Sequence, residues 1–152
     1  MIKHTAWKLT VLISSLTLIG CSSNLANPAT RVTGARIVQH SEQGTRVEVE
    51  IELTNPNTTP LPLIKSDYTV STGNGQAYHA TERLNRTLPS RGKQTITLPA
   101  VFAGGAGTGE GSYSVTGSVS YEPPGEMRKL LTESRYPLPS VGVSGSGVLS
   151  VQ

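Results

Sequence analysis

Residues 45–53, TRVEVEIEL, decide the fold of this chain. Positions 47, 49, 51 and 53 are apolar, whereas positions 46, 48, 50 and 52 are charged. Successive side chains of a β-strand point to opposite faces of the sheet, so this alternation puts one set in a core and the other in water. A helix would scatter the same apolar residues around its circumference. The segment is therefore predicted to be a strand with one buried face.

Two further segments alternate in the same way, residues 112–121 (SYSVTGSVSY) and residues 93–102 (KQTITLPAVF). Gly117 interrupts the apolar face of the first, which predicts a bulge or the close approach of a neighbouring element. Pro99 has no backbone N–H, so the second strand is expected to lie at a sheet edge or to contain a bulge. Weaker strand patterns cover residues 31–39, 61–70, 76–83 and 127–138.

Turn signals rich in Gly, Pro and Asn separate these segments at short intervals, at residues 42–44, 55–57, 73–75, 90–92, 104–111 and 123–125. A sustained apolar period of 3.6 residues, the mark of a helix, is not seen in the sequence. About seven short strands with regular turns predict an all-β fold. We expect an antiparallel β-sandwich of the immunoglobulin-like or fibronectin-III-like kind.

The start of the chain has the pattern of an export signal. Lys3 and Lys8 precede an uncharged run over residues 9–19, which leads to Gly20 and Cys21. This pattern resembles a bacterial lipoprotein signal, which is cleaved between Gly20 and Cys21 and acylated on Cys21. The run of 11 residues is too short to span a bilayer, which needs about 20. An ordinary cleaved signal and a short anchor helix are the alternatives.

The chain is accordingly divided into three parts: a signal peptide (1–20), the lipidated cysteine with a tether (21–30), and one sandwich domain (31–152). Residues 22–30, SSNLANPAT, are uncharged and offer little apolar surface to bury, which is why we expect a tether. In the usual bacterial sorting pattern an aspartate after the cysteine retains a lipoprotein in the inner membrane. Ser22 stands there instead, which predicts the periplasmic face of the outer membrane.

The charge balance argues against nucleic acid as a partner. The full chain has a formal net charge of +3, but Lys3 and Lys8 leave with the signal, so 11 basic and 10 acidic residues remain. Such a domain has no long-range field to attract phosphates and few aromatic residues on which bases could stack. Cys21 is the only cysteine, which excludes an internal disulfide and a thiolate metal site.

Groups that could carry catalysis or bind a metal are few. After residue 20 the sequence has two histidines, His40 and His79, and a single aspartate, Asp67, without a G-x-S-x-G motif or a close histidine pair. The glycines at 104–109 precede a strand and have no lysine nearby, so a hairpin loop is expected rather than a phosphate loop. We predict no enzymatic activity, no metal and no cofactor. Convergence of His40, His79 and Asp67 in one cleft would reverse that prediction.

Two charged groups have a structural and a functional interpretation. Alternate glutamates at 48, 50 and 52 are expected to form a solvated stripe that pairs with Arg or Lys across strands, rather than a calcium site. Arg83, Arg86, Arg91 and Lys93 are the densest basic group. They are candidates for contact with anionic lipid or polysaccharide phosphate, or else form a soluble hairpin end balanced by Glu82.

The middle of the chain resembles a known family. The strand at 45–53 is followed by Asn55-Pro56-Asn57, by the PLPL segment at 60–63, by the strand containing Tyr68 and by a TLP segment at 87–89. This order is similar to that of the type-2 late embryogenesis abundant (LEA type 2) family, including the water-stress and hypersensitive-response (WHy) domain. The resemblance covers roughly residues 31–138. The glycine-rich segment at 104–111 and the Gly/Ser-rich end depart from the compact family pattern.

The resemblance implies a non-enzymatic β-sandwich associated with desiccation and other stress. Asn55, Pro56 and Asn57 are a structural motif, because proline ends the strand ladder and the asparagines can cap turn amides. We therefore expect an envelope lipoprotein, attached to the membrane through Cys21, that carries a stress-associated sandwich. The alternative is an interaction module that binds an envelope protein or an anionic glycan.

Overall fold

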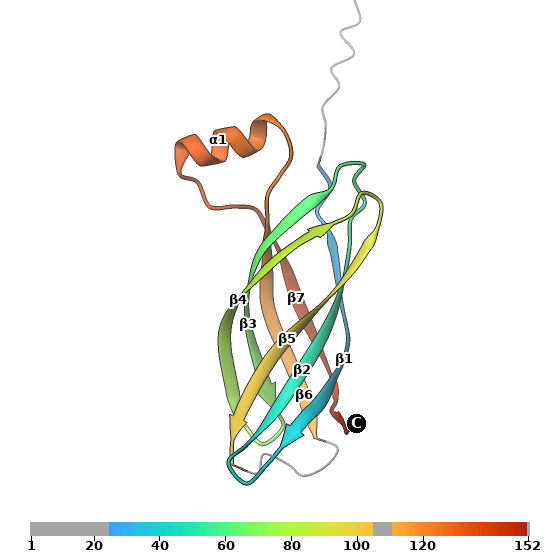
Figure 1. Ribbon diagram of the computed structural model, residues 1–152, viewed down its shortest axis with the longest axis vertical. Helices are drawn as coiled ribbons and strands as arrows, with labels where there is room; N and C mark the ends of the chain where they lie inside the picture. Colours follow the sequence, from blue (N-terminus) through green and yellow to red (C-terminus); the bar gives the residue numbers. More distant parts are fainter. Residues whose placement is uncertain (1–24, 105–110, 152) are drawn as a thin grey trace, which may run out of the picture.

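The computed structural model describes residues 25–104 and 111–151. These residues form two sheets packed face to face in an elongated sandwich (Figure 1). Sheet A has the strand order β5-β2-β1-β8, and sheet B has the order β4-β3-β6-β7. All pairings are antiparallel except the short parallel contact between β1 and β8. The predicted all-β sandwich is confirmed.

The elements follow one another as β1 (Ala29–His40), β2 (Gly44–Thr54), β3 (Leu61–Thr72), β4 (Ala77–Leu88), β5 (Lys93–Ala103), β6 (Ser112–Tyr121), α1 (Glu126–Ser134), β7 (Ser140–Val148) and β8 (Ser150–Val151). The segments predicted at 45–53 and 93–102 lie within β2 and β5, and 112–121 is the whole of β6. The weaker patterns at 31–39 and 61–70 lie within β1 and β3, and 76–83 overlaps β4.

The core lies between the sheets and is built from the apolar parity of each strand. Val47, Val49, Ile51 and Leu53 of β2 are at most 1% exposed, so the alternation that predicted this strand also defines its buried face. Leu61, Leu63 and Val70 of β3, with Val115 and Val119 of β6, belong to the same buried cluster. Each such side chain stabilises the fold by about 1.5–3 kcal/mol when fully buried.

Both local predictions about strand irregularity are confirmed. Pro99 lies in β5, the edge strand of sheet A, where a missing N–H costs no ladder bond on the open side. Gly117 is approached closely by the neighbouring strand β3: a Cβ at this position would lie 2.4 Å from the carbonyl oxygen of Asp67. The hydroxyl of Tyr68 on β3 donates a hydrogen bond to the Pro99 carbonyl, which links the two sheets.

The strand predicted over residues 127–138 is wrong, because helix α1 (Glu126–Ser134) occupies most of this segment. Its sequence, EMRKLLTES, opens with strong helix formers, and the helix ends at Arg135, which adopts a left-handed conformation with φ 54°. Only two and a half turns long, α1 is too short for a sustained apolar period to appear in the sequence. The helix lies in the connection between β6 and β7 and extends outside the two sheets (Figure 1).

Residues 25–30 are held on the domain, although they were expected to be part of a tether at 21–30. Leu25 packs against the core, Pro28 is buried, and β1 starts at Ala29 rather than at residue 31. The expectation neglected polar partners from elsewhere in the chain. Asn57 hydrogen-bonds the backbone of Ala26, and the Tyr121 hydroxyl donates to Asn27 Oδ1 at 3.1 Å.

Within the described ranges, none of the helices has both the length and the apolar character needed to cross a membrane.

Candidate functional surfaces

The outer face of sheet B is a regular array of small hydroxyl side chains. We call it the hydroxyl face and define it by Thr69, Ser71, Thr81, Ser114, Thr116, Ser118, Ser144 and Ser146. Strand register places these residues in rows: Thr69 pairs with Thr116, which pairs with Ser144, and in the next row Ser71 pairs with Ser114, which pairs with Ser146. Adjacent strands lie about 4.8 Å apart, and residues on one face repeat about every 6.6 Å along a strand. The face therefore presents evenly spaced, uncharged hydrogen-bonding groups.

Asp67 and His79 lie in this face and share a shallow hollow with Thr69 and Thr116. The Asp67 carboxylate accepts a hydrogen bond from Thr81 Oγ1 at 2.6 Å and forms an ion pair with Lys65 Nζ at 2.8 Å. The hydrogen bond from Lys65 has the larger effect and that from Thr81 the smaller one; both lower the pKa of Asp67 below its ordinary value of 3.8. These contacts keep the carboxylate charged and occupied by partners on its own face.

His40 lies on the other sheet. It is the last residue of β1 in sheet A, and its Nδ1 is 2.8 Å from Thr45 Oγ1. His79 Nδ1 is likewise 2.7 Å from a threonine hydroxyl, that of Thr69. The structure thus brings Asp67 and His79 to one face but does not bring His40 to them. Across residues 25–104 and 111–151, no cluster of three His, Cys, Asp or Glu side chains is arranged to hold a metal ion.

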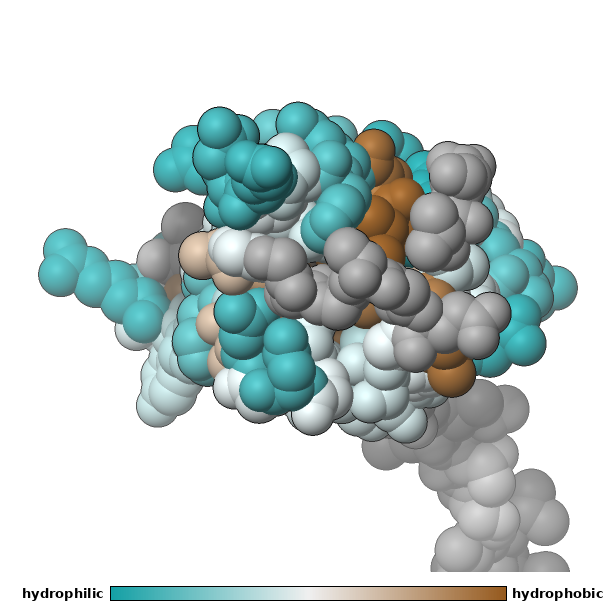
Figure 2. All heavy atoms as spheres, turned by 90° about the horizontal axis from the view of Figure 1, so that it is seen from below, coloured by the Kyte–Doolittle hydropathy of each residue, from teal (hydrophilic) through white to brown (hydrophobic). Residues whose placement is uncertain are grey.

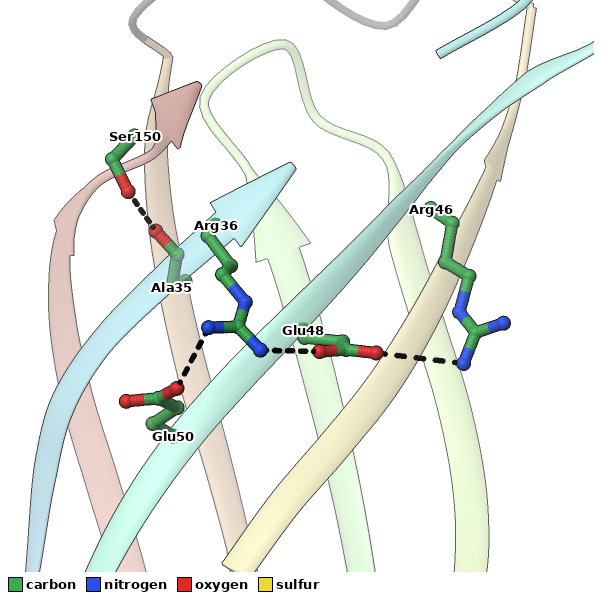
Figure 3. Close-up of polar contacts among 6 residues, drawn as sticks. All are labelled: Ala35, Arg36, Arg46, Glu48, Glu50 and Ser150. Atoms are coloured by element: carbon green, nitrogen blue, oxygen red, sulfur yellow. Dashed lines mark hydrogen bonds and ion pairs between the residues drawn. The ribbon is translucent and has the colours of Figure 1, made fainter. Parts of the chain in front are cut away.

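The outer face of sheet A carries a series of ion pairs. Arg36 lies between two glutamates, with guanidinium nitrogens 3.0 Å from Glu48 Oε2 and 3.3 Å from Glu50 Oε1 (Figure 3). Arg46 approaches the other oxygen of Glu48 at 3.5 Å. Glu52 is shared by Arg31 of β1 at 3.6 Å and Lys93 of β5 at 3.0 Å. The prediction of cross-strand pairing for the glutamate stripe is confirmed, and the two outer faces differ sharply in chemistry.

The four residues of the predicted basic group are spread over one corner of the sandwich. Arg83 and Arg86 are exposed on β4, the edge strand of sheet B, whereas Arg91 lies in the turn before β5. Lys93, on β5, is ion-paired with Glu52. Three arginines of the group are therefore exposed near one edge, and the lysine belongs to the ion pairs of sheet A.

The Asn-Pro-Asn motif holds three segments together at one end of the sandwich. Asn55 is 1% exposed, and its Nδ2 donates to the carbonyl oxygens of Thr59 at 2.9 Å and Pro89 at 3.1 Å. Its Oδ1 accepts hydrogen bonds from both the backbone and the side-chain nitrogen of Asn57, each at 2.9 Å. Both donors and both acceptor sites of Asn55 are thus used. One buried side chain thus joins the backbone at Thr59, Pro89 and Asn57.

Asn57 continues this network to the start of the chain. Its Oδ1 accepts a hydrogen bond from Ala26 N at 2.9 Å, and its Nδ2 donates to Ala26 O at 2.8 Å. Its own carbonyl accepts from Arg91 N at 2.8 Å. The side-chain amide therefore pairs with an extended backbone as a neighbouring strand would. The local sequence gave no sign of this contact, because the partners are 31 residues apart.

Gly20 and Cys21, the predicted cleavage and lipidation sites, lie outside the described residues and remain predictions.

At the end of the sandwich away from α1, hydrophilic side chains form much of the visible surface, with a smaller group of hydrophobic residues among them (Figure 2).

Family models give no match to the chain, and neither do the curated proteins. Solved structures do match. One is the solution structure of a late embryogenesis abundant protein, At2g46140.1, with a TM-score of 0.61 and 13% identity over 82% of this chain and 71% of that one. Another is AT1g01470 from Arabidopsis thaliana, with a TM-score of 0.58 and 10% identity over 86% of this chain and 89% of that one. The chain therefore has the β-sandwich fold of a late embryogenesis abundant protein, as the resemblance around Asn55-Pro56-Asn57 predicted.

Proposed function

We propose that this protein is a lipid-anchored lipoprotein of the bacterial envelope whose β-sandwich, without enzymatic activity, protects against desiccation and related stress. The observation that carries the proposal is the fold, which is shared with a late embryogenesis abundant protein over 82% of the chain. The lipoprotein pattern that ends at Cys21 supplies the location. Ser22 after the cysteine favours the periplasmic face of the outer membrane.

The surfaces of the domain support a protective role. The hydroxyl face offers many equivalent, uncharged hydrogen-bonding groups, which suits weak contact with many polar partners as water is withdrawn. The separation of His40 from Asp67 and His79 favours a non-enzymatic role, and so does the use of the Asp67 carboxylate by Lys65 and Thr81. Enzymes that use such residues hold them within hydrogen-bond reach of one another.

The anchor is tested by removing the acylated residue. Each methylene of an acyl chain that enters the bilayer contributes about 0.8 kcal/mol, so several chains make attachment effectively permanent. A Cys21→Ser chain should therefore appear in the soluble fraction, whereas the wild-type chain should sediment with membranes. Retention of the Cys21→Ser chain in the membrane fraction would contradict the anchor.

The protective role is tested by survival of a deletion strain through drying and osmotic shock. Loss of survival that is restored by the intact gene supports the proposal, and unchanged survival contradicts it. The role of the hydroxyl face is tested by complementation with Ser114→Ala, Thr116→Val and Ser144→Ala combined. The control, Thr95→Val plus Thr97→Val, removes two exposed hydroxyls from sheet A. We expect the first variant alone to lose protection while both fold.

A second candidate function is binding to an anionic glycan or an envelope protein. It is favoured by the exposed Arg83 and Arg86 on β4, an edge strand whose outer side has no neighbour in sheet B. Cosedimentation with a phosphate-bearing polysaccharide tests the glycan, with Arg83→Gln plus Arg86→Gln as the variant. Arg31→Gln plus Arg46→Gln, on the outer face of sheet A, removes the same charge and is the control. Binding that is lost only in the β4 variant and weakens with salt would support this function.

A further inference from the structure

One side of helix α1 is apolar and faces solvent. Met127 is 49% exposed and Leu130 is 63% exposed, and both lie on the same side of the helix because they are three residues apart. Tyr136, just after the helix, is 69% exposed. Glu126, Lys129 and Glu133 line one shallow hollow together with Met127 and Leu130, so charged side chains border this apolar pair. We call Met127 and Leu130 the apolar side of α1; both are turned to solvent, whereas Leu131 is half-buried. Such residues on a helix normally join the core.

This helix lies beside the place where the chain enters the domain. α1 and the first described residues are at the same end of the sandwich (Figure 1). Leu25 and Asn57 line one pocket together with Gly125, Glu126 and Met127, so the start of the helix adjoins the start of the described chain. The two hydrogen bonds between the Asn57 side chain and the Ala26 backbone hold the start of the described chain in this position.

The distance to the lipidation site is short. Cys21 precedes Leu25 by four residues, which reach at most about 14 Å when fully extended. Helix α1 itself is about 13 Å long. An anchor on Cys21 would therefore hold the apolar side of α1 within about one helix length of the bilayer surface. The effective concentration of lipid at such range is high, so even a weak contact would be occupied.

We infer that α1 is a membrane-contacting helix, which places Met127, Leu130 and Tyr136 at the boundary between headgroups and acyl chains of the anchoring bilayer. The inference rests on the proposed lipid anchor. The occupant of this surface is the bilayer itself, because the anchor restricts the end of the domain that carries α1 to the lipid surface. Tyrosine suits this depth, since its ring is apolar and its hydroxyl remains hydrated.

The contact is hydrophobic rather than electrostatic. From Glu122 to Tyr136 the segment has three acidic and three basic residues, which leaves no net charge to attract anionic headgroups. Arg128 is already ion-paired with Glu122, with its Nε 3.2 Å from Oε2. Zwitterionic lipid should therefore suffice, and added salt should not release the helix.

A single tryptophan reports the position of the helix. The only tryptophan of the sequence is Trp7, which leaves with the signal peptide, so Leu130→Trp places the sole indole of the anchored chain on the apolar side of α1. The control is Val101→Trp, at another exposed apolar position, on β5 in sheet A. Each anchored chain is purified from membranes and reconstituted in phosphatidylcholine vesicles with or without brominated acyl chains, and emission is measured on floated vesicles.

The inference expects quenching by brominated lipid and a blue-shifted emission for Leu130→Trp, with neither change for Val101→Trp. A chain that floats with vesicles but shows no difference between the two positions overturns the membrane contact and leaves the anchor intact. A chain that does not float overturns the anchor and the inference with it.

Because tryptophan itself favours the interface, hydrogen exchange on the chain without substitutions in α1 is the second measurement. The amides of residues 126–134 should exchange more slowly on vesicles than in the soluble Cys21→Ser chain, whereas those of β5 should be unchanged. Equal exchange in both states would overturn the inference.

Discussion

The substitution Asn55→Ala tests whether the Asn-Pro-Asn motif stabilises the domain through the hydrogen bonds of one buried amide. The side chain is 1% exposed and makes four hydrogen bonds, to the carbonyls of Thr59 and Pro89 and to two nitrogens of Asn57. Alanine removes all four, so the Thr59 carbonyl loses the donor from Asn55, whereas the Pro89 carbonyl keeps the hydrogen bond from the Gly92 amide. The stability of the domain should therefore be far more sensitive to substitution of Asn55 than to substitution of an exposed residue of the motif.

The expected loss follows from the bond count. Each intramolecular hydrogen bond contributes about 1 kcal/mol net, and a buried group left without a partner costs about 1–3 kcal/mol. Since water can enter at the edge of this loop and satisfy part of the loss, the free energy of unfolding should fall by about 3–4 kcal/mol. For a domain of this size that corresponds to a decrease in Tm of roughly 12 °C.

The assay is equilibrium urea unfolding of the soluble Cys21→Ser chain, followed by circular dichroism. Thr58→Ala, an exposed position in the same loop, is the control and should change stability by less than about 0.5 kcal/mol. A loss below about 1 kcal/mol for Asn55→Ala would refute the reasoning, because it would show that the four bonds are replaced at little cost.

The isosteric substitution Asn55→Asp separates shape from hydrogen bonding. The carboxylate would face two carbonyl oxygens, those of Thr59 and Pro89, without a proton to donate. Burial and these oxygens should raise its pKa in the folded state by more than the two hydrogen bonds from Asn57 lower it. The variant should then lose stability as pH rises from about 4, the ordinary pKa of an aspartate, to the raised pKa of the folded state, and regain it on acidification. A flat pH dependence relative to wild type would contradict this picture.

Three further outcomes can be measured on the same chain. Tyr68→Phe should cost about 1–2 kcal/mol in urea unfolding, because the Pro99 carbonyl loses its donor. Burial raises the pKa of Tyr68 to about 12, so the folded state favours the neutral hydroxyl. The free energy of unfolding should therefore fall as pH rises from about 10 to about 12. The Tyr68→Phe variant should not show this fall. Because the pKa of Asp67 is lowered in the folded state, its ionised form adds stability above pH 3.8, and this stability is lost as pH falls through the lowered pKa. Asp67→Asn should therefore make stability less dependent on pH at acid pH. A carboxyl titration by NMR should place the midpoint of Asp67 below 3.8. Gly117→Ala should cost about 1–3 kcal/mol through the clash with β3, whereas Gly142→Ala on β7 has open space around its Cβ and should be neutral or slightly stabilising; equal effects of the two would show that the strands move apart easily.

The strands could be predicted where one-sided burial imposes a period of two. Residues 45–53 and 112–121 show that pattern directly, since each alternate residue enters the core. Helix α1 was not predicted because its nine residues are too few for the apolar pattern of a helix to repeat. They contain one set of apolar residues at i, i+3 and i+4, at Met127, Leu130 and Leu131. Two of these residues, Met127 and Leu130, are also exposed, so they follow no core pattern.

The candidate surfaces depended on information that local sequence does not contain. The hydroxyl face arises when register brings Thr69 beside Thr116, two residues that are far apart in the chain. The docking of residues 25–30 likewise depends on Asn57, because a short polar segment without charge looks like a tether until its partner is known. Serines opposite the apolar residues of β6 were visible in the sequence, but their continuation across β3 and β7 was not.

The placement of the chain entry and of α1 at one end of an elongated sandwich, with β8 toward the other, has a consequence for an anchored population (Figure 1). A molecule attached at that end would stand upright, with its strands running away from the lipid. Its two broad outer faces would then point sideways, toward neighbouring copies and whatever fills the space between them. On a crowded leaflet such molecules would form a layer of upright domains. The hydroxyl face of each domain would hold water in the gap between it and its neighbour. Protection would in that case depend on the number of copies per unit area of membrane more than on the affinity of any one copy.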